Sequence, residues 1–556
     1  MEVASINQSN KNSLYLWILI LSGIIFFIPF LGYVHLFDWD EINFAESARE
    51  MIVTGNYHRV QINFQPFWEK PPLFFWLQVA CMKAFGINEF AARLPNALFG
   101  IITLVTFYLI GKKYKSARFG FLWAIAYFGT FLPHLYFKSA IIDPVFNYFI
   151  FLGLYFMFLS IGKNIQAKRA LVYAALSGLL IGLATLTKGP VGLLVFLIAF
   201  FVYFIFHSFK NFPGVKKILL FTVFFVLVCL LWFGQEIAEN GFWFLKEFLA
   251  YQADLFLHPV ASHGEPWYYH FVVVFIGCFP ISILALPIIF QKEENNKTDF
   301  RRLMKILFWT VMILFSLTTT KIVHYSSLTY MPLAFMAAIY LDRLIETGVV
   351  IKKWVLIMLV IMGIIFSFLL TALPYVAMHP ELLLPYLKDP YAAASLNVNV
   401  QWSGYEVLIG IVYLLLLFLS FFFFTKRKNK LAIYFLFYTT ACCLFIYLLA
   451  VVPKIERYSQ GPAIEFYKTL EGKNVYVWPI GFKSYAQYFY AKKPASPVYG
   501  EKDEPFLLKG PIHIPAFFVV KVSNTSFDTS CAGCKIIKQE GGFKFYRRDP
   551  QAELIK

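Results

Sequence analysis

The chain has 556 residues, of which 59% are hydrophobic, 20% aromatic and only 15% charged. A soluble core of this size does not need so much apolar surface, so the composition excludes an ordinary soluble enzyme and predicts a protein whose solvent is the bilayer. The formal net charge of +17 could suit nucleic acid, but the cations cluster between hydrophobic runs. That placement favours a membrane topology and no nucleic-acid partner.

Apolar runs of the length that crosses a bilayer recur between residues 14 and 452, and they predict a polytopic all-α protein with about thirteen transmembrane helices. Examples are residues 14–33, 192–206, 354–376 and 407–424. Basic clusters follow every second run, at residues 112–118, 163–169, 210–217, 301–305, 352–353 and 426–430. The positive-inside rule then predicts a cytoplasmic N-terminus and, with an odd number of spans, an external C-terminus. The first run is predicted to remain as an anchor, because no small-residue cleavage site follows Phe30.

The composition changes after Val452, which predicts two domains, residues 1–452 in the membrane and residues 453–556 as a small soluble domain outside it. Short apolar runs (NVYVWPI, FFVVKV, FKFYRR) alternate with Gly, Pro, Asn and Asp, as in a small α/β or mostly β domain. Cys531 and Cys534 form a CAGC motif there. A zinc site would require a second pair, so the motif predicts a disulfide on the exported side.

The loop after the first span, residues 35–91, carries most of the acidic side chains. Its run FDWDEINFAESARE has charged residues at i,i+4 spacing, which predicts a short interfacial helix. The stretch PPLFFWLQVACMKAFG is too short to span and predicts a second interfacial helix. The acids could simply solvate an outer loop, but the same loop continues into FWEKPPL, where Glu69 and Lys70 precede a proline pair.

Other spans add charged groups at their outer ends. Asp143 opens the fourth span in KSAIIDPVF, where an acid also suits the helix dipole without any function. Lys188, in LTKGP, is a cation on the outer side, against the charge bias, and suits an anion. Lys321 and Tyr325, in TTTKIVHYSS, lie at a further outer turn.

These groups predict one cavity at the outer interface that holds carboxylates and lysines. Such a set suits transfer from a phosphate leaving group, where a base activates the acceptor and cations neutralise the departing phosphate. The histidines of HPVASHGEPWYYH could be ligands, although a lone histidine is more often a hydrogen-bonded interface residue. A transporter or flippase would use similar charges, but closer to mid-bilayer. A scaffold protein that binds partners through its soluble tail is a third alternative.

The motifs DWDEIN, FWEKPPL, the span-opening DP, LTKGP, HGEPWYY and TKIVHY together resemble the polyprenyl-phosphate-sugar-dependent glycosyltransferases of the GT-C class. The likeness is to the bacterial aminoarabinose lipid A transferases and their protein mannosyltransferase cousins. It implies a GT-C fold in the bacterial inner membrane with a periplasmic C-terminal domain. The implied activity takes a sugar from an undecaprenyl-phosphate carrier to lipid A or another envelope glycan. Protein O-glycosylation is the alternative within the class.

The resemblance also implies roles for individual residues. The catalytic carboxylate falls on Asp40, with Glu41 beside it, and a second acid falls on Asp143. The residues that bind the donor phosphate correspond to Lys70, Lys188, Tyr325, Arg49 and Lys321. A structural zinc site of the family would use Glu69 and His263. The sequence departs from the aminoarabinose transferase pattern at Asn43, where those enzymes have an arginine, so the sugar is left open and Arg49 or Arg59 could supply the missing charge.

Overall fold

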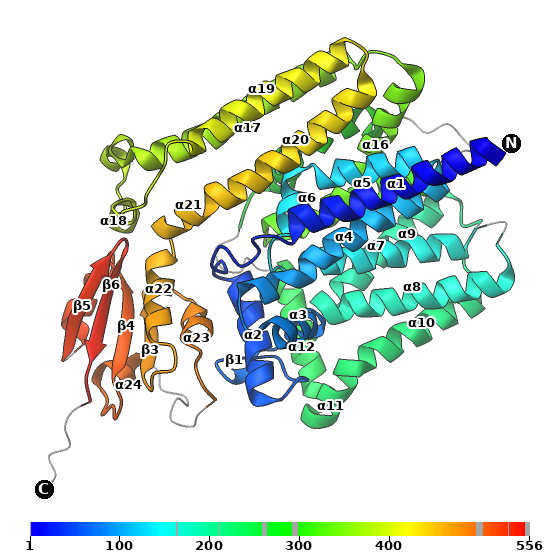
Figure 1. The fold of residues 1–556 in the computed structure, drawn as a ribbon. Coiled ribbons are helices and arrows are strands. Elements are labelled where there is room, and N and C mark those ends of the chain that lie inside the picture. The colour runs from blue at the N-terminus through cyan, green and yellow to red at the C-terminus, as the bar shows by residue number, and fades with distance from the viewer. Residues whose placement is uncertain are drawn as a thin grey trace, which may run out of the picture.

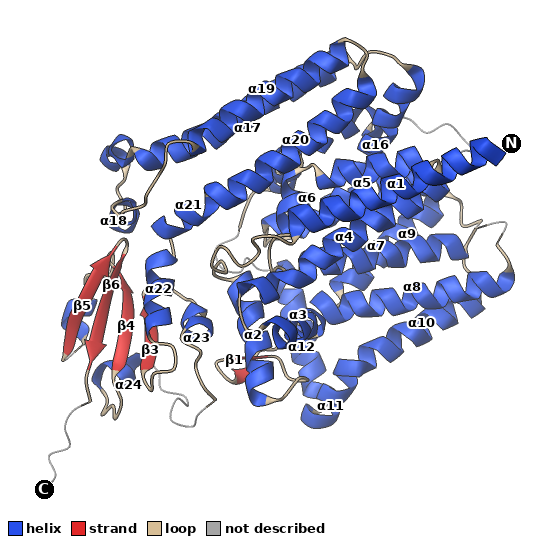
Figure 2. Cartoon of the chain, in the orientation of Figure 1, coloured by secondary structure: helices blue, strands red, loops and turns tan. Residues whose placement is uncertain are grey.

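The computed structural model describes residues 2–162, 165–210, 212–257, 264–291, 299–495, 504–531 and 533–550. Long helices run roughly parallel through one large bundle, and a small sheet lies beyond one end of it (Figures 1 and 2). The long helices of the bundle are α1 (Glu2–Phe27), α4 (Glu89–Tyr114), α5 (Ala117–Phe128), α7 (Asp143–Ser160), α8 (Ala167–Lys188), α9 (Val191–Phe206), α10 (Val215–Cys229), α15 (Asp299–Leu317), α16 (Tyr330–Thr347), α17 (Lys353–Met378), α19 (Glu406–Thr425) and α20 (Asn429–Ala450). This arrangement confirms the predicted all-α membrane architecture with a small C-terminal sheet region.

Short elements complete the bundle. They are α6 (Phe131–Tyr136), the π-helix η1 (Leu230–Gly234), α11 (Gln235–Asn240), α13 (Tyr269–Gly277), α14 (Ile281–Ile289) and the 3₁₀ helix η2 (Val323–Thr329). Among the described residues, eight helices are long and apolar enough to cross a membrane, or nine if α13 and α14, bent by 116°, form one span. Apolar helices at 12–27, 117–128 and 191–206 are shorter than that criterion requires. The count of about thirteen spans therefore stays a prediction.

Residues 35–91 fold into helices and turns at the end of the bundle that faces the sheet (Figure 1). They contain α2 (Asp40–Thr54), the two-residue strands β1 (Gln61–Ile62) and β2 (Gln65–Pro66), and α3 (Leu73–Phe85). Both helices predicted for this loop are present. α2 ends at Gly55, whose φ of 71° is the left-handed conformation that glycine adopts most readily at a helix C-terminus. A further outer helix, α12 (Phe242–Leu257), belongs to the second long loop.

The C-terminal region is a four-stranded mixed sheet with short helices. Its elements are β3 (Tyr476–Ile480), β4 (Ala516–Lys521), β5 (Cys534–Glu540), β6 (Phe543–Arg548), α21 (Val452–Tyr458), α22 (Gly461–Thr469), α23 (Ala486–Tyr490), α24 (Glu504–Lys509) and α25 (Phe527–Ser530). The strand order is β3-β4-β6-β5, with β3 parallel to β4 and the other pairs antiparallel. The third long loop contributes η3 (Pro380–Leu382), η4 (Leu384–Tyr386) and α18 (Pro390–Leu396) beside this region.

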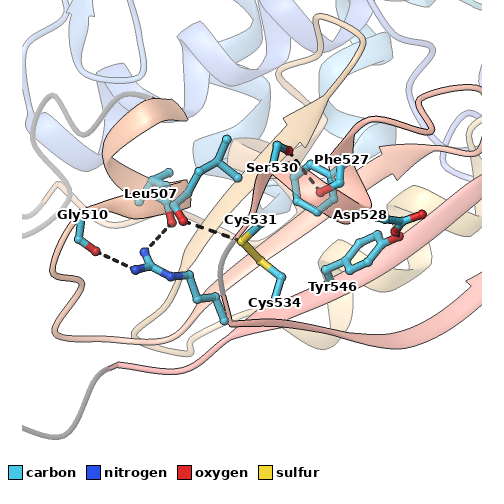
Figure 3. Close-up of a disulfide and its surroundings, with 10 residues drawn as sticks. Leu507, Gly510, Phe527, Asp528, Ser530, Cys531, Cys534 and Tyr546 are labelled. Carbon is cyan, nitrogen blue, oxygen red and sulfur yellow. Dashed lines mark hydrogen bonds between the residues drawn. A yellow bond between two sulfur atoms is a disulfide. The ribbon is translucent and has the colours of Figure 1, made fainter.

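The predicted CAGC disulfide is present in this region. Cys531 and Cys534 are joined, with their Cα atoms 5.6 Å apart (Figure 3), and Cys534 is paired with the strand residue Arg548. The Arg548 guanidinium donates to the carbonyl oxygens of Leu507 and Gly510, both at 2.8 Å. The disulfide and the buried arginine therefore tie the loops at this edge of the sheet together.

One hydrophobic cluster joins the first outer loop to the C-terminal region. It includes Phe44 and Ala48 from α2, Phe74 from α3, and Tyr467 and Phe545 from the C-terminal elements. The N-terminus lies at the other end of the bundle from the sheet (Figure 1). The first loop is thus packed between the bundle and the C-terminal region, and both parts can influence its conformation.

Candidate functional site

Asp40 is the first residue of α2 and lies where the first loop meets the bundle. Its side chain is 40% exposed, and its Oδ2 atom is 3.6 Å from Nε2 of His324. The preceding residue, Trp39, has a φ of 74°, a conformation in which a bulky side chain is strained and which is held only when the surrounding structure imposes it. Asp40 therefore presents an accessible carboxylate at a backbone position that its neighbours determine.

Asp143, at the start of α7, lies on the other side of His324. Its Oδ2 atom is 3.8 Å from the His324 Nε2 atom, and its Oδ1 atom accepts from Lys188 Nζ at 2.6 Å. The Asp143 side chain is only 5% exposed. The structure thus brings Asp40, Asp143 and Lys188 together from α2, α7 and the end of α8, although more than 140 residues separate Asp40 from Lys188 in the sequence. Lys188 is therefore partly neutralised by Asp143, whereas Asp40 remains the more accessible carboxylate.

Lys70 adds a second cation to the same region, from the turn that precedes α3. Burial and the charge of Lys188 lower the pKa of Lys70, while Glu69, Asp40 and Asp143 partly offset them. A lowered pKa means that the ammonium form lacks enough negative charge around it. An anion between Lys70 and Lys188 would relieve this repulsion.

Lys70, Lys188 and Asp143 line a cavity, here called the bundle cavity. Its walls are Lys70, Asp143, Phe146, Asn147, Ile150, Lys188, Val191, Val195, Gln252, Phe315, Thr318, Tyr325 and Leu328. Tyr325 lies under the ammonium of Lys188, with its ring centre 5.0 Å from Nζ. The polar groups are at the loop end, and Val191, Val195 and Phe315 continue along α9 and α15. The cavity thus combines two cations and a carboxylate with an apolar wall.

Helix α12 covers the turn that carries Lys188. Gln252 of this helix donates to the carbonyl oxygen of Glu69 at 3.1 Å. A Cβ atom built on Gly189 would lie 3.3 Å from the side chains of Gln252 and Phe248, and Gly189 has a φ of 89°. The glycine of LTKGP is therefore required both by its backbone conformation and by the close approach of α12.

Glu41, predicted beside the catalytic acid, lies away from the cavity in a buried ion pair. Its two carboxylate oxygens accept from Arg93 at 2.9 and 2.7 Å, and one of them also accepts from the backbone N–H of Ala140 at 2.6 Å. Burial alone would raise the pKa of Glu41, but the Arg93 charge and these hydrogen bonds outweigh it and the pKa is lowered. Glu41 therefore fastens α2 to α4 and to the loop before α7.

Arg49, predicted near the donor phosphate, is buried in α2 and is bound by another residue of the same helix. It forms a two-point ion pair with Glu46, with both N–O distances 2.7 Å. Glu50 lies beside this pair, and burial together with the Glu46 charge raises its pKa to about 9. Arg59 instead pairs with Glu239 of α11 at 2.9 Å. Neither arginine is among the residues that line the bundle cavity.

Lys321 lies close to the bundle cavity but is turned toward backbone. It is buried, and its Nζ atom donates to the carbonyl oxygen of Thr318 at 2.6 Å. Thr318 itself lines the cavity. Lys321 therefore contributes positive charge behind the wall, whereas Lys70 and Lys188 are part of the wall.

Glu69 is the one member of the predicted zinc pair that can be located, because His263 lies outside the described residues. The Glu69 carboxylate hydrogen-bonds the side chain of Tyr251 on α12. Among the residues that the structure describes, no group of three or more His, Cys, Asp or Glu side chains could hold a metal ion. The described donors alone do not make up a zinc site.

Three polar residues at the site were not assigned a role from the sequence. His324 lies between the two carboxylates, Asn147 donates to Ser327 at 2.8 Å, and Gln252 holds the backbone of Glu69. The motif TKIVHY contains His324, so a signal for that residue existed. Asn147 and Gln252 had no recognisable signal, because both lie in ordinary helical sequence and only the folded chain brings them to the cavity.

Comparison with known proteins agrees with this architecture. The sequence model of the dolichyl-phosphate-mannose-protein mannosyltransferase family matches residues 69–233. An uncharacterised protein of Aquifex aeolicus (strain VF5) is 28% identical over 351 residues, which are 62% of this chain and 77% of that protein. The undecaprenyl phosphate-alpha-4-amino-4-deoxy-L-arabinose arabinosyl transferase of Wigglesworthia glossinidia brevipalpis is 24% identical over 348 residues, 61% of this chain and 60% of that enzyme.

A solved structure is similar over nearly the whole chain. It is that of ArnT from Cupriavidus metallidurans bound to undecaprenyl phosphate, with a TM-score of 0.76 and 16% identity, and the match covers 97% of this chain and 99% of that one. The fold is therefore the GT-C fold of multi-span membrane glycosyltransferases. More particularly, the chain resembles the aminoarabinose transferases and the protein mannosyltransferases, which confirms the resemblance inferred from the motifs.

Proposed function

We propose that this protein transfers a sugar from a polyprenyl-phosphate carrier to an acceptor at the outer face of the bacterial inner membrane. The observation that carries the proposal is the bundle cavity, where an accessible Asp40 lies beside a cavity wall that contains Lys70, Lys188 and Asp143. The name of the Wigglesworthia relative specifies an undecaprenyl-phosphate-linked sugar, and the ArnT structure contains undecaprenyl phosphate. Both support a donor of this type for the present chain.

In the proposed reaction, an acceptor oxygen attacks the anomeric carbon of the donor sugar. A bond forms between these two atoms, and the bond from the anomeric carbon to the phosphate oxygen breaks. The polyprenyl phosphate leaves with the electron pair, and Lys70 and Lys188 stabilise its charge. Asp40 accepts the proton when the acceptor is a hydroxyl. Asp143 holds Lys188 in place through their 2.6 Å contact.

An apolar groove supports a donor with a long hydrocarbon chain. It lies between α9 and α15 and is lined by Ile198, Val202, Phe206, Arg302, Lys305, Ile306, Trp309, Thr310, Ile313, Leu314 and Leu317. The same two helices supply Val191, Val195 and Phe315 to the bundle cavity. A prenyl chain that followed this groove would leave its phosphate at the two lysines. The same features suit a lipid-linked sugar more than a free nucleotide sugar.

The acceptor in this proposal is an envelope glycan or glycolipid such as lipid A. The proposal also places the C-terminal region on the periplasmic side. A protein hydroxyl is the second candidate within the same reaction class. A deletion strain compared with its parent by mass spectrometry of lipid A and envelope glycans would separate the two. One sugar missing from lipid A supports the first candidate, and an unchanged glycolipid profile contradicts it.

Asp40→Asn tests the role of the carboxylate directly. General acid–base groups contribute roughly 10²–10⁴-fold, so transfer by the purified variant should fall by at least about a hundredfold when the acceptor is a hydroxyl, while undecaprenyl phosphate binding is retained. Asp549→Asn is the matched control, because Asp549 is an exposed aspartate in the C-terminal region that pairs with the neighbouring Arg547. Wild-type transfer to a hydroxyl acceptor by Asp40→Asn would contradict the proposal.

A further inference from the structure

A second cavity is lined in part by the two residues that precede Asp40 and lies at the junction with the C-terminal region. This cavity, here called the domain cavity, is lined by Asp38, Trp39, Tyr391, Ser459, Gln460, Ala463, Ile464, Tyr467, Gly481, Phe482, Lys483, Ser484, Ala486, Lys521 and Phe543. These residues come from the first loop, α18, α22 and the sheet. None of the site residues expected from the sequence lines it, and the proposed donor chemistry does not use it.

The chemistry of this lining combines flat aromatic faces with two ammonium groups. Lys483 Nζ is 5.9 Å from the ring centre of Trp39, and Lys521 Nζ is 4.8 Å from that of Tyr391. Within the described part of the chain, neither lysine forms an ion pair. Two lysines beside aromatic rings suit a sugar that carries a phosphate, since the apolar C–H face of a pyranose packs on an aromatic ring and ammonium groups bind phosphate.

Asp38, the acid in the lining, forms hydrogen bonds with neighbouring residues. Asp38 accepts from the backbone N–H of Trp39 at 3.0 Å and hydrogen-bonds the side chain of Ser484. Its remaining electrostatic partner is Lys521. The carboxylate therefore orients the loop, and both lysines are without an ion-pair partner among the described residues.

Two further observations point to a ligand. The Tyr467 side chain is 1% exposed, and its hydroxyl has no hydrogen-bond partner among the described residues, which is unusual for a buried polar group. Trp39 is 52% exposed although its backbone is held at a φ of 74°. A large aromatic ring kept outward in a strained conformation is a feature of binding surfaces.

We propose that the domain cavity binds the acceptor, and that the acceptor is a phosphate-bearing saccharide held by Lys483, Lys521 and the ring of Trp39. The inference rests on the proposed function, because Asp40 follows Trp39 directly and is the carboxylate proposed there to activate the acceptor. Donor phosphate and acceptor would thus approach Asp40 from two different cavities. The site is assigned to the phosphorylated saccharide of a glycolipid or of a soluble glycan.

The test measures equilibrium binding to the full chain in nanodiscs without any donor. The probes are a phosphorylated lipid A-type disaccharide lipid, its dephosphorylated form and soluble glucosamine 1-phosphate. Charge-assisted hydrogen bonds to phosphate are lost in K483E/K521E, so this variant should weaken binding of the phosphorylated lipid by at least about tenfold. Binding of the dephosphorylated lipid should be unchanged by this variant. Trp39→Ala should weaken both lipids and Trp39→Phe should restore them.

The matched control is K509E/K535E, which reverses two exposed lysines of the same region outside the cavity. Loss of glucosamine 1-phosphate binding in K483E/K521E would assign the site to soluble sugar phosphates as well as to lipids. Equal binding of the phosphorylated and dephosphorylated lipids by wild type, or undiminished binding by K483E/K521E, would overturn the proposal. Intact binding in a protein that transfers no sugar would instead contradict only the proposed function.

Discussion

Asp40 and Glu41 are neighbours with the same functional group, and the fold gives them different surroundings. Asp40 remains 40% exposed beside His324, whereas Glu41 is 4% exposed and bound to Arg93. Successive residues of a helix point about 100° apart, so Asp40 points toward His324 and Glu41 toward the packed interior. The sequence could nominate both residues but could not separate them, because Arg93 lies 52 residues further along the chain.

Glu41→Gln should destabilise the protein without acting on the reaction itself. The substitution leaves the buried Arg93 guanidinium without a counter-charge, which costs about 3–5 kcal/mol when one partner of a buried pair is removed. We expect a lower thermal unfolding midpoint for this variant in detergent, whereas Asp40→Asn keeps the wild-type midpoint. If Glu41→Gln unfolds like wild type but loses activity, Glu41 is a catalytic group after all.

Glu50 makes the stability of the first loop depend on pH. Its pKa is raised from 4.5 to about 9 by burial and by Glu46, so folding favours the protonated form. The stabilising contribution is complete below pH 4.5 and is lost as pH rises toward 9, by at most about 1.4 kcal/mol per pH unit for a single proton. Unfolding midpoints measured from pH 5 to 9.5 should therefore fall for wild type.

Glu50→Gln should flatten that pH profile, because the amide does not ionise. Glu471→Gln provides the control, since Glu471 is an exposed acid that pairs with Lys492 on the surface. A Glu50→Gln profile as steep as that of wild type would assign the pH dependence to other groups.

At the scale of elements, the turn between α8 and α9 and the covering helix α12 act as one unit. Gly189→Ala should displace Lys188, because its φ of 89° is nearly restricted to glycine and the new methyl group would meet Gln252 and Phe248. We expect the affinity for undecaprenyl phosphate to fall by roughly tenfold, which corresponds to about 1.4 kcal/mol.

Gly214→Ala is the matched control, since its φ is −68° and nothing lies within 4 Å of the added Cβ atom. Donor affinity should be measured by competition with a labelled polyprenyl phosphate. Unchanged affinity in Gly189→Ala would mean that Lys188 does not depend on the conformation of this turn.

The elements of the first loop were predictable because their signals are local. The i,i+4 spacing and the proline pair placed α2 and α3 correctly, and the CAGC spacing predicted the disulfide. The arrangement of these elements was not predictable in the same way. Arg49 offers a charge in the sequence, but only the fold reveals that Glu46 already binds it. The role of α12 depends on a contact between Gln252 and Glu69 that spans 183 residues.

At the scale of the whole molecule, the C-terminal region holds the backbone that leads to Asp40. Gln460 of this region accepts from the N–H of Asp38 at 3.0 Å and donates to the carbonyl oxygen of Leu36 at 2.8 Å. The hydroxyl of Tyr490 accepts from the N–H of Leu36 at 2.8 Å. Composition predicted a separate soluble domain, but it gave no indication that this domain supports the site.

Gln460→Ala should therefore lower the rate of transfer more than it lowers donor binding. Removing two hydrogen bonds from the segment before Asp40 should raise the activation free energy of transfer by about 1–3 kcal/mol. This increase corresponds to a rate lower by roughly 5- to 150-fold. Gln460→Glu keeps the acceptor oxygen and should recover part of the rate. If Gln460→Ala transfers sugar at the wild-type rate, the C-terminal region does not position Asp40.

The disulfide between Cys531 and Cys534 also provides a way to determine the orientation of the chain in the membrane. Disulfides persist in oxidising compartments and are reduced in the cytosol. In intact cells, these two sulfurs should resist a thiol-alkylating reagent until a reductant is added if the C-terminal region is exported. Peptide mass analysis of the CAGC segment would therefore determine the sidedness of the membrane protein without any added tag.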